Sequence, residues 1–251
     1  AILAVSLATA KAAALAKGVS LFRYVGALEG ITDPRLLPIP MMNIINGGKH
    51  AAGSTDIQEF MVVPIGARSF SEALHMGTNI FHALGKILHE KGYGTTVGDE
   101  GGYTPAVKNG NEEALTLISE AVEKAGYILG TDIGIALDVA ASELYRDGKY
   151  HLATENKTLS SGELIAWYKG LIDRYHIISI EDGLSEDDWA GWTAMTATLP
   201  LQLVGDDLLV TNAAFVKKGI EQKAANAVLV KVNQIGTLTE TMETVRMAKS
   251  A

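Results

Sequence analysis

Short apolar runs alternate with longer amphipathic stretches along the second half of the chain. The apolar runs occupy residues 134–137, 177–180, 201–204 and 227–230. Apolar residues recur at helical spacing in the stretches 161–174, 186–198, 212–221 and 237–249. Short continuous apolar strands that alternate with helices are typical of parallel strands buried on both faces. The pattern predicts an α/β fold, either an open doubly wound sheet or a closed barrel.

The first half of the chain is less regular. Its predicted elements are two strands followed by two helices, at residues 38–45, 60–63, 71–91 and 111–126. Residues 1 to about 30 read as a separate helical pair. In the second half, Asp147-Gly148 is a turn signal that predicts a hairpin over 144–152.

Ionisable residues follow the strands of the second half at the same position. These residues are Asp138, Glu181, Asp206 and Lys231. Successive parallel strands with such groups at their C-terminal ends are the arrangement of a (β/α) barrel, where the site gathers at that face. An open sheet would usually place its ligand near a Gly-rich phosphate loop, and the sequence contains neither G-x-G-x-x-G nor G-x-x-x-x-G-K-[ST]. The barrel is therefore favoured.

Three of these residues are carboxylates that would converge at adjacent strand ends. Asp138, Glu181 and Asp206 would repel one another unless a cation joined them. Oxygen ligands select a hard ion, so Mg²⁺ is the natural candidate. The alternative for each residue is a helix N-cap or a solvated turn acid.

Lys231 and two clusters in the first half are further candidates for chemistry. Lys231 follows an apolar strand and would lie near a bound cation, and both surroundings favour the neutral form of a lysine, which can serve as a general base. The alternative is a surface lysine whose aliphatic stem is buried. The loop 98–102, Gly-Asp-Glu-Gly-Gly, places two acids between glycines, which allow close backbone approach to a ligand, although a simple turn is the alternative. Residues 46–50 and 56–59 bring amide, imidazole and carboxylate groups to the junction of the first two strands.

Composition narrows the class of protein. The 251 residues are 47% hydrophobic and 20% charged, with a net charge of −8, which are the values of an ordinary globular protein. The negative charge argues against nucleic acid or an anionic membrane as a general partner. The absence of cysteine excludes disulfides, a thiolate nucleophile and Cys-based metal sites, and a reducing cytosol is the expected compartment. The apolar run 189–205 is broken by Pro200, so no membrane span is expected there.

Seven segments, in order, resemble signatures of the enolase family, the glycolytic phosphopyruvate hydratases. They are residues 43–50, 56–61, 97–102, 136–138, 179–183, 204–207 and 229–236. The resemblance extends over essentially the whole chain. It implies an enolase-type (β/α)₈ barrel (ββαα, then βα units), incomplete in this chain, and the Mg²⁺-dependent reversible dehydration of 2-phosphoglycerate to phosphoenolpyruvate in glycolysis and gluconeogenesis.

The resemblance also implies the metal ligands and the base. Asp138, Glu181 and Asp206 match the ligands of the high-affinity Mg²⁺. Lys231 matches the base that removes the C2 proton of 2-phosphoglycerate. A proton beside a carboxylate is very weakly acidic, so the chemistry requires positive charge at that carboxylate.

On the other side of the substrate, Glu100 matches the acid that protonates the departing C3 hydroxyl, and Glu59 matches its acidic helper. His50 and Gln58 match positions that contact the substrate. The expected substrate-binding set is completed by residues already named, Glu59, Asp206 and Lys231.

The resemblance divides the chain into two parts. Residues 1–35 are expected to be the last helices of an N-terminal lid domain, and 36–251 the partial barrel that carries the site. Further strands with a Ser-His-Arg-Ser-Gly-Glu segment and another lysine are expected beyond residue 251, so the activity is expected of the complete protein. A homo-oligomer in the cytoplasm is also implied, with a possible further pool at the cell surface or secreted. The alternative is a truncated, non-catalytic enolase-like binding or surface protein.

Overall fold

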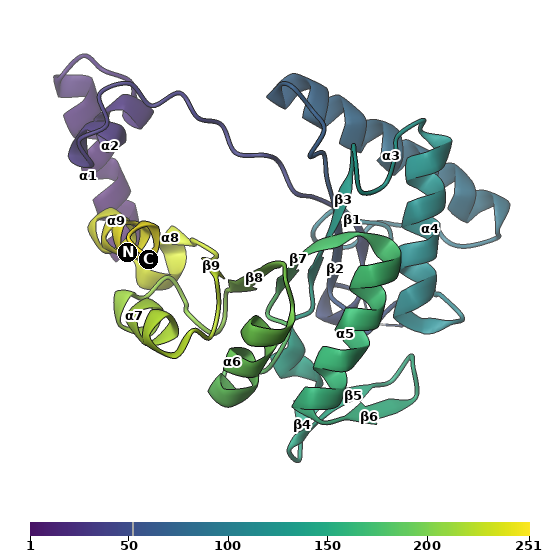
Figure 1. The fold of residues 1–251 in the computed structure, drawn as a ribbon. Helices are drawn as coiled ribbons and strands as arrows, with labels where there is room; N and C mark the ends of the chain where they lie inside the picture. Colours follow the sequence, from purple (N-terminus) through teal and green to yellow (C-terminus); the bar gives the residue numbers. More distant parts are fainter. Residues whose placement is uncertain (52) are drawn as a thin grey trace.

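A six-stranded mixed sheet forms the body of the protein in a computed structural model that describes residues 1–51 and 53–251 (Figure 1). The strand order is β1-β2-β3-β7-β8-β9. Strand β2 runs antiparallel to its two neighbours β1 and β3, and β3, β7, β8 and β9 run parallel. The strands are β1 (Met42–Asn46), β2 (Glu59–Val63), β3 (Gly134–Asp138), β7 (Ile177–Glu181), β8 (Gln202–Gly205) and β9 (Ala227–Val228). The predicted α/β fold, an incomplete barrel, is confirmed.

Helices connect the strands and cover the outer face of the sheet (Figure 1). Those of the body are α3 (Phe70–Glu90), α4 (Gly110–Lys124), α5 (Ser161–Tyr175), α6 (Trp189–Thr198), α7 (Ala213–Gln222), α8 (Val232–Ile235) and α9 (Leu238–Lys249), with the short 3₁₀ turns η1 (Gly48–His50) and η2 (Ala141–Leu144). Most predicted elements agree with these bounds within a few residues. The strand predicted at 38–45 begins only at Met42, because Pro38 and Pro40 have no N–H to donate to a strand ladder.

The excursion between β3 and α5 is a small separate sheet. Its strands are β4 (Tyr145–Arg146), β5 (Lys149–Leu152) and β6 (Lys157–Leu159). The predicted hairpin is present, and both turn residues have positive φ, 51° at Asp147 and 77° at Gly148, as a type I′ turn requires. The third strand, β6, was not predicted.

The two faces of the main sheet differ in what they bury. The outer face packs on the helices through a large apolar core that includes Ile44, Phe60 and Leu115. The inner face carries a small group made of Met61, Val63 and Ala136. Since side chains alternate along a strand, Glu59 on β2 and Asp138 on β3 share this inner face. The candidate site therefore lies at the end of the inner face.

The N-terminal helices lie beside the C-terminal helix and away from the first strands (Figure 1). Helix α1 (Ile2–Ala16) and helix α2 (Leu21–Leu28) are joined to β1 by an extended segment. The Ser6 hydroxyl accepts the Leu238 N–H at 3.0 Å, and Arg246 lies 3.6 Å from Glu29. Among the described residues, no single helix has the length and apolar character of a membrane span. Helices α1 and α2 meet those criteria only as a pair, bent by 102°.

Candidate active site

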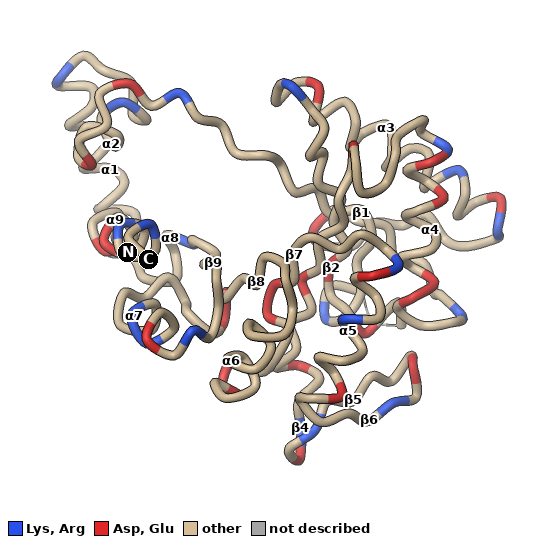
Figure 2. The backbone as a smooth tube through the Cα atoms, viewed as in Figure 1, with Lys and Arg blue, Asp and Glu red and all other residues tan. Residues whose placement is uncertain are grey.

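Carboxylates lie at the C-terminal ends of three neighbouring parallel strands. Asp138 ends β3 and pairs in register with Glu181, which ends β7. Asp206 directly follows β8. Acidic residues are visible around the ends of β7 and β8 in Figure 2. The structure thus brings the three predicted metal ligands to one edge of the sheet.

Glu181 is a buried carboxylate without a hydrogen-bond donor. The residue is only 8% exposed. Within residues 1–51 and 53–251, no group donates a hydrogen bond to its carboxylate oxygens. Burial, followed by the charges of Asp138, Asp182 and Asp206, raises the pKa of Glu181 to about 9. A buried carboxylate that no donor satisfies is unfavourable unless a cation is bound to it.

Asp138 is held in place by its own turn and by the neighbouring strand. One carboxylate oxygen accepts the Ala140 N–H at 3.0 Å, and the other accepts Nε2 of Gln58 at 3.4 Å. Burial and the charge of Glu59 raise the pKa of Asp138 to about 7. The predicted substrate residue Gln58 therefore contacts a predicted metal ligand.

Asp206 is paired with Lys231 in the structure. The Lys231 ammonium donates to one oxygen of Asp206, and Nε2 of Gln234 donates to the other at 2.6 Å. Burial lowers the pKa of Lys231, but the bond to Asp206 and the charges of Asp206, Glu181 and Asp138 outweigh it, so the pKa is raised. The expectation of a neutral lysine concerns the site with a cation bound, and it stays a prediction. The Lys231 side chain is also 45% exposed, because it follows β9 at the start of α8 rather than ending a buried strand.

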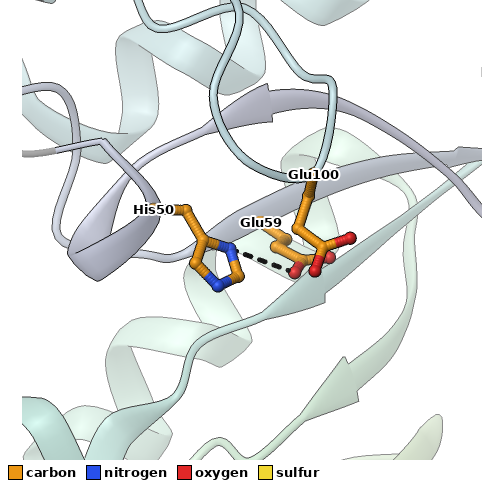
Figure 3. A group of neighbouring side chains, drawn as sticks. All are labelled: His50, Glu59 and Glu100. Carbon is orange, nitrogen blue, oxygen red and sulfur yellow. Dashed lines mark ion pairs between the residues drawn. The ribbon is translucent and has the colours of Figure 1, made fainter.

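The second group of candidates lies beside the first, on the neighbouring antiparallel strand β2, where Glu59 pairs in register with Asp138. His50, Glu59 and Glu100 point toward one another from η1, β2 and the loop 98–102 (Figure 3). Nδ1 of His50 lies 3.4 Å from Oε1 of Glu59. Burial and the charge of Glu100 raise the pKa of Glu59 to about 7, against the opposing effect of Lys231. Glu59 can therefore carry a proton near neutral pH beside Glu100.

The loop that carries Glu100 is fastened to the end of β1. The Gly98 N–H bonds the Gly102 carbonyl at 2.8 Å, and Gly101 has φ of 82°. The Gly102 N–H donates to Oδ1 of the fully buried Asn46 at 2.8 Å. A turn with positive φ and close backbone contact explains why glycines flank the two acids. The loop thus approaches the end of β1 closely, and its approach to a ligand stays a prediction.

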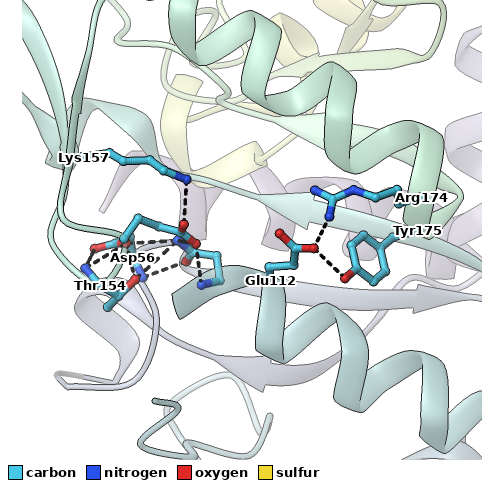
Figure 4. Close-up of polar contacts among 8 residues, drawn as sticks. Asp56, Glu112, Thr154, Lys157, Arg174 and Tyr175 are labelled. Carbon is cyan, nitrogen blue, oxygen red and sulfur yellow. Dashed lines mark hydrogen bonds and ion pairs between the residues drawn. The ribbon is translucent and has the colours of Figure 1, made fainter. Parts of the chain in front are cut away.

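The turn before Gln58 and Glu59 is held by a buried polar network (Figure 4). Oδ1 of Asn111 accepts the N–H groups of Asp56 and Ile57 at 2.9 and 3.0 Å. The Asp56 carboxylate accepts Nδ2 of Asn111 at 3.0 Å and the N–H of Thr154 at 3.1 Å. Helix α4 and the small sheet thereby fix the residues that lead into the site.

Several residues of the site were not assigned a role from the sequence. Asp182, Asp206 and Asp207 have carboxylate oxygens within 4.8 Å of one another, whereas Asp138 and Glu181 belong to no such compact group among the described residues. Gln234 donates to Asp206, and Asn46 holds the Glu100 loop. These residues fall inside the quoted motifs, but their partners are distant in sequence, so local pattern gave no signal.

The oxygen donors at the strand ends fit a hard divalent cation. Glu181 offers an unsatisfied buried carboxylate, and its neighbours Asp138 and Asp206 add negative charge that a cation would compensate. An incomplete α/β barrel with an acidic site at the C-terminal ends of its strands is the architecture of barrel enzymes. Residues 34–251 match the family model described as the enolase C-terminal TIM barrel domain. The chain belongs to this family.

Proposed function

We propose that this chain provides the catalytic barrel residues of an enolase, which converts 2-phosphoglycerate to phosphoenolpyruvate and water. The observation that carries the proposal is that a lysine and acidic side chains gather in two groups at the same end of the sheet. Glu181 ends β7, and Asp206 follows β8 and accepts the Lys231 ammonium; Glu59 begins the antiparallel strand β2, and Glu100 approaches it from the loop 98–102. A dehydration needs a base at one carbon and an acid at the next, so the arrangement supports this chemistry.

Asp138, Glu181 and Asp206 are proposed to hold the metal, which we take to be Mg²⁺. When bound, Mg²⁺ supplies positive charge that stabilises the anionic substrate carboxylate during C2 deprotonation and offsets the carboxylates that raise the pKa of Lys231. Asp206 and Lys231 are also proposed to contact the substrate. Lys231, once neutral, takes the C2 proton on its Nζ.

Glu100 is proposed to complete the reaction. The electron pair left at C2 forms the C2–C3 double bond as the C3–oxygen bond breaks, and the hydroxyl leaves as water with a proton from Glu100. Glu59, whose pKa is raised to about 7, helps to keep a proton on this side. His50 and Gln58 are proposed to contact the substrate beside it. Three further proposals rest on the family resemblance: a homo-oligomer, a cytoplasmic location, and residues 1–35 as the last helices of an N-terminal lid domain.

Conversion of 2-phosphoglycerate by the complete protein tests this function. Phosphoenolpyruvate is followed by its ultraviolet absorbance with Mg²⁺ present, and a turnover near the enzyme median of about 10 per second is expected. Racemisation or cycloisomerisation of other carboxylic acids, with 2-phosphoglycerate left unchanged, would assign the site to another reaction of the superfamily. No turnover of any α-proton acid would favour a non-catalytic binding protein.

A further inference from the structure

Asp182 is a buried acid next to a proposed metal ligand. It follows Glu181 directly, is 5% exposed and has φ of 43°, in the left-handed region that few non-glycine residues adopt. Its backbone N–H donates to the Val204 carbonyl at 3.0 Å, and its carbonyl accepts the Ala141 N–H at 2.9 Å. The residue therefore connects the ends of β7 and β8 with the turn after β3.

The Asp182 side chain is bonded to the backbone of a second proposed ligand. Oδ1 accepts the Asp206 N–H at 3.0 Å, and Oδ2 accepts the Asp207 N–H at 2.8 Å. Both oxygens are thus used in charge-assisted hydrogen bonds to consecutive amides. These bonds fix the backbone from which the Asp206 side chain projects.

A competing interpretation treats Asp182, Asp206 and Asp207 as a metal site, since their oxygens lie within 4.8 Å of one another. The hydrogen bonds argue against it. Both oxygens of Asp182 are held by backbone amides, whereas one oxygen of Asp138 and both oxygens of Asp206 are bonded only by side chains, which can turn away from a bound cation. Asp207 is exposed, and Glu181 is buried and has no donor among the described residues. The carboxylates of Asp182, Asp206 and Asp207 lie close together because the Asp182 side chain is bonded to the backbone N–H groups of Asp206 and Asp207.

We propose that Asp182 is a positioning residue, which holds Asp206 in place for metal binding and is not itself a ligand. The inference rests on the proposed function, because it assumes that Asp138, Glu181 and Asp206 bind the cation. Groups that orient metal ligands without touching the metal affect affinity strongly, and their loss typically weakens binding about 10- to 100-fold.

Titration of the complete protein with Mn²⁺, followed by electron paramagnetic resonance, tests the proposal. Asp182→Asn keeps the size of the side chain but places an NH₂ group against one of the two backbone N–H donors. We expect its Mn²⁺ Kd to rise about 10-fold or more, with an altered spectrum of the bound ion. Asp207→Asn removes the same charge one residue from Asp206 and is expected to bind within about twofold of wild type.

The outcomes separate the two interpretations. Wild-type affinity and spectrum in Asp182→Asn would overturn the positioning role, and so would an equal loss in Asp207→Asn, which the three-aspartate site predicts. Glu181→Gln and Asp138→Asn should lose most of the binding. If Glu181→Gln and Asp138→Asn both bind Mn²⁺ like wild type, the metal site of the proposed function is wrong, and the positioning role is wrong with it. Wild-type binding in Asp182→Asn, or an equal loss in Asp207→Asn, overturns the positioning role alone.

A measurement on the wild-type protein covers the case in which Asp182→Asn does not fold. Scalar couplings through hydrogen bonds, measured by NMR, should connect the amide nitrogens of Asp206 and Asp207 with the Asp182 carboxyl carbon. We expect the couplings to persist at saturating Mg²⁺, because Asp182 keeps its backbone partners. Their loss on addition of Mg²⁺, or their absence from the start, would overturn the proposal.

Discussion

Gly102 lies where the Glu100 loop touches the end of β1. A Cβ at this residue would lie 2.9 Å from backbone atoms of Ile45 and 2.8 Å from Oδ1 of Asn46. The loop cannot keep both its hydrogen bond to Asn46 and a side chain at this position. The close contact between the loop and β1 therefore requires a residue without a Cβ at position 102.

Gly102→Ala should push the Glu100 loop away from β1 and lower kcat/KM for 2-phosphoglycerate about 100-fold, because small displacements of a catalytic group are costly. Mg²⁺ affinity should stay unchanged, since the carboxylates are on other strands. Gly94→Ala is the matched control: a Cβ there meets nothing within 4 Å. Steady-state kinetics and calorimetry measure both effects. Equal activity in the two variants would contradict the proposed packing of the loop.

Helix α4 contributes to the site from outside the sheet. Its second residue, Asn111, is fully buried and bonds the amides of Asp56 and Ile57, just before Gln58 and Glu59. Two residues earlier, Asn109 precedes the helix without a side-chain capping bond. Two asparagines at one helix start therefore have different energetic roles.

Asn111→Ala should lower the free energy of unfolding by about 2–4 kcal/mol, because two buried amides lose their acceptor. Asn109→Ala should change it by less than about 0.5 kcal/mol. Urea denaturation followed by circular dichroism measures both values. Equal destabilisation by the two substitutions would mean that the network around Asp56 does not support the turn.

The order of elements was largely predictable, whereas the partners of single residues were not. The strands that precede Asp138, Glu181 and Asp206 are continuous apolar runs, so their period and ends could be read locally. Asp182 and Asn111 lie within recognisable segments, but their bonds reach other strands and helices. The protonation of Lys231 also depends on carboxylates that are distant in sequence, and these cannot be read from the residues around Lys231.

At the scale of the whole molecule, an extended segment separates the N-terminal helices from the sheet (Figure 1). Leu36 is 97% exposed and Leu37 is 67% exposed. On one side, α1 and α2 lie against α9; on the other, β1 begins the mixed sheet. The segment that joins the two parts predicted from the sequence is thus strongly exposed at these residues.

Limited digestion with chymotrypsin should first cut between Leu36 and Leu37, because the Leu37–Pro38 bond is protected by the proline. Mass spectrometry should then detect a fragment of residues 37–251. Leu36→Asp is the control and should delay this cut. First cuts within the strands β3 or β7, before any in the segment, would contradict the division into residues 1–35 and 36–251.

The assignment of base and acid is the central claim, and one measurement tests it most directly. Proton NMR of 2-phosphoglycerate in D₂O, with Mg²⁺ and the complete protein, follows C2 exchange and product together. Lys231→Ala should abolish both, because no C2 anion forms. Glu100→Gln should abolish product and leave measurable C2 exchange, because the anion still forms and returns. Exchange that survives in Lys231→Ala and vanishes in Glu100→Gln would contradict the account.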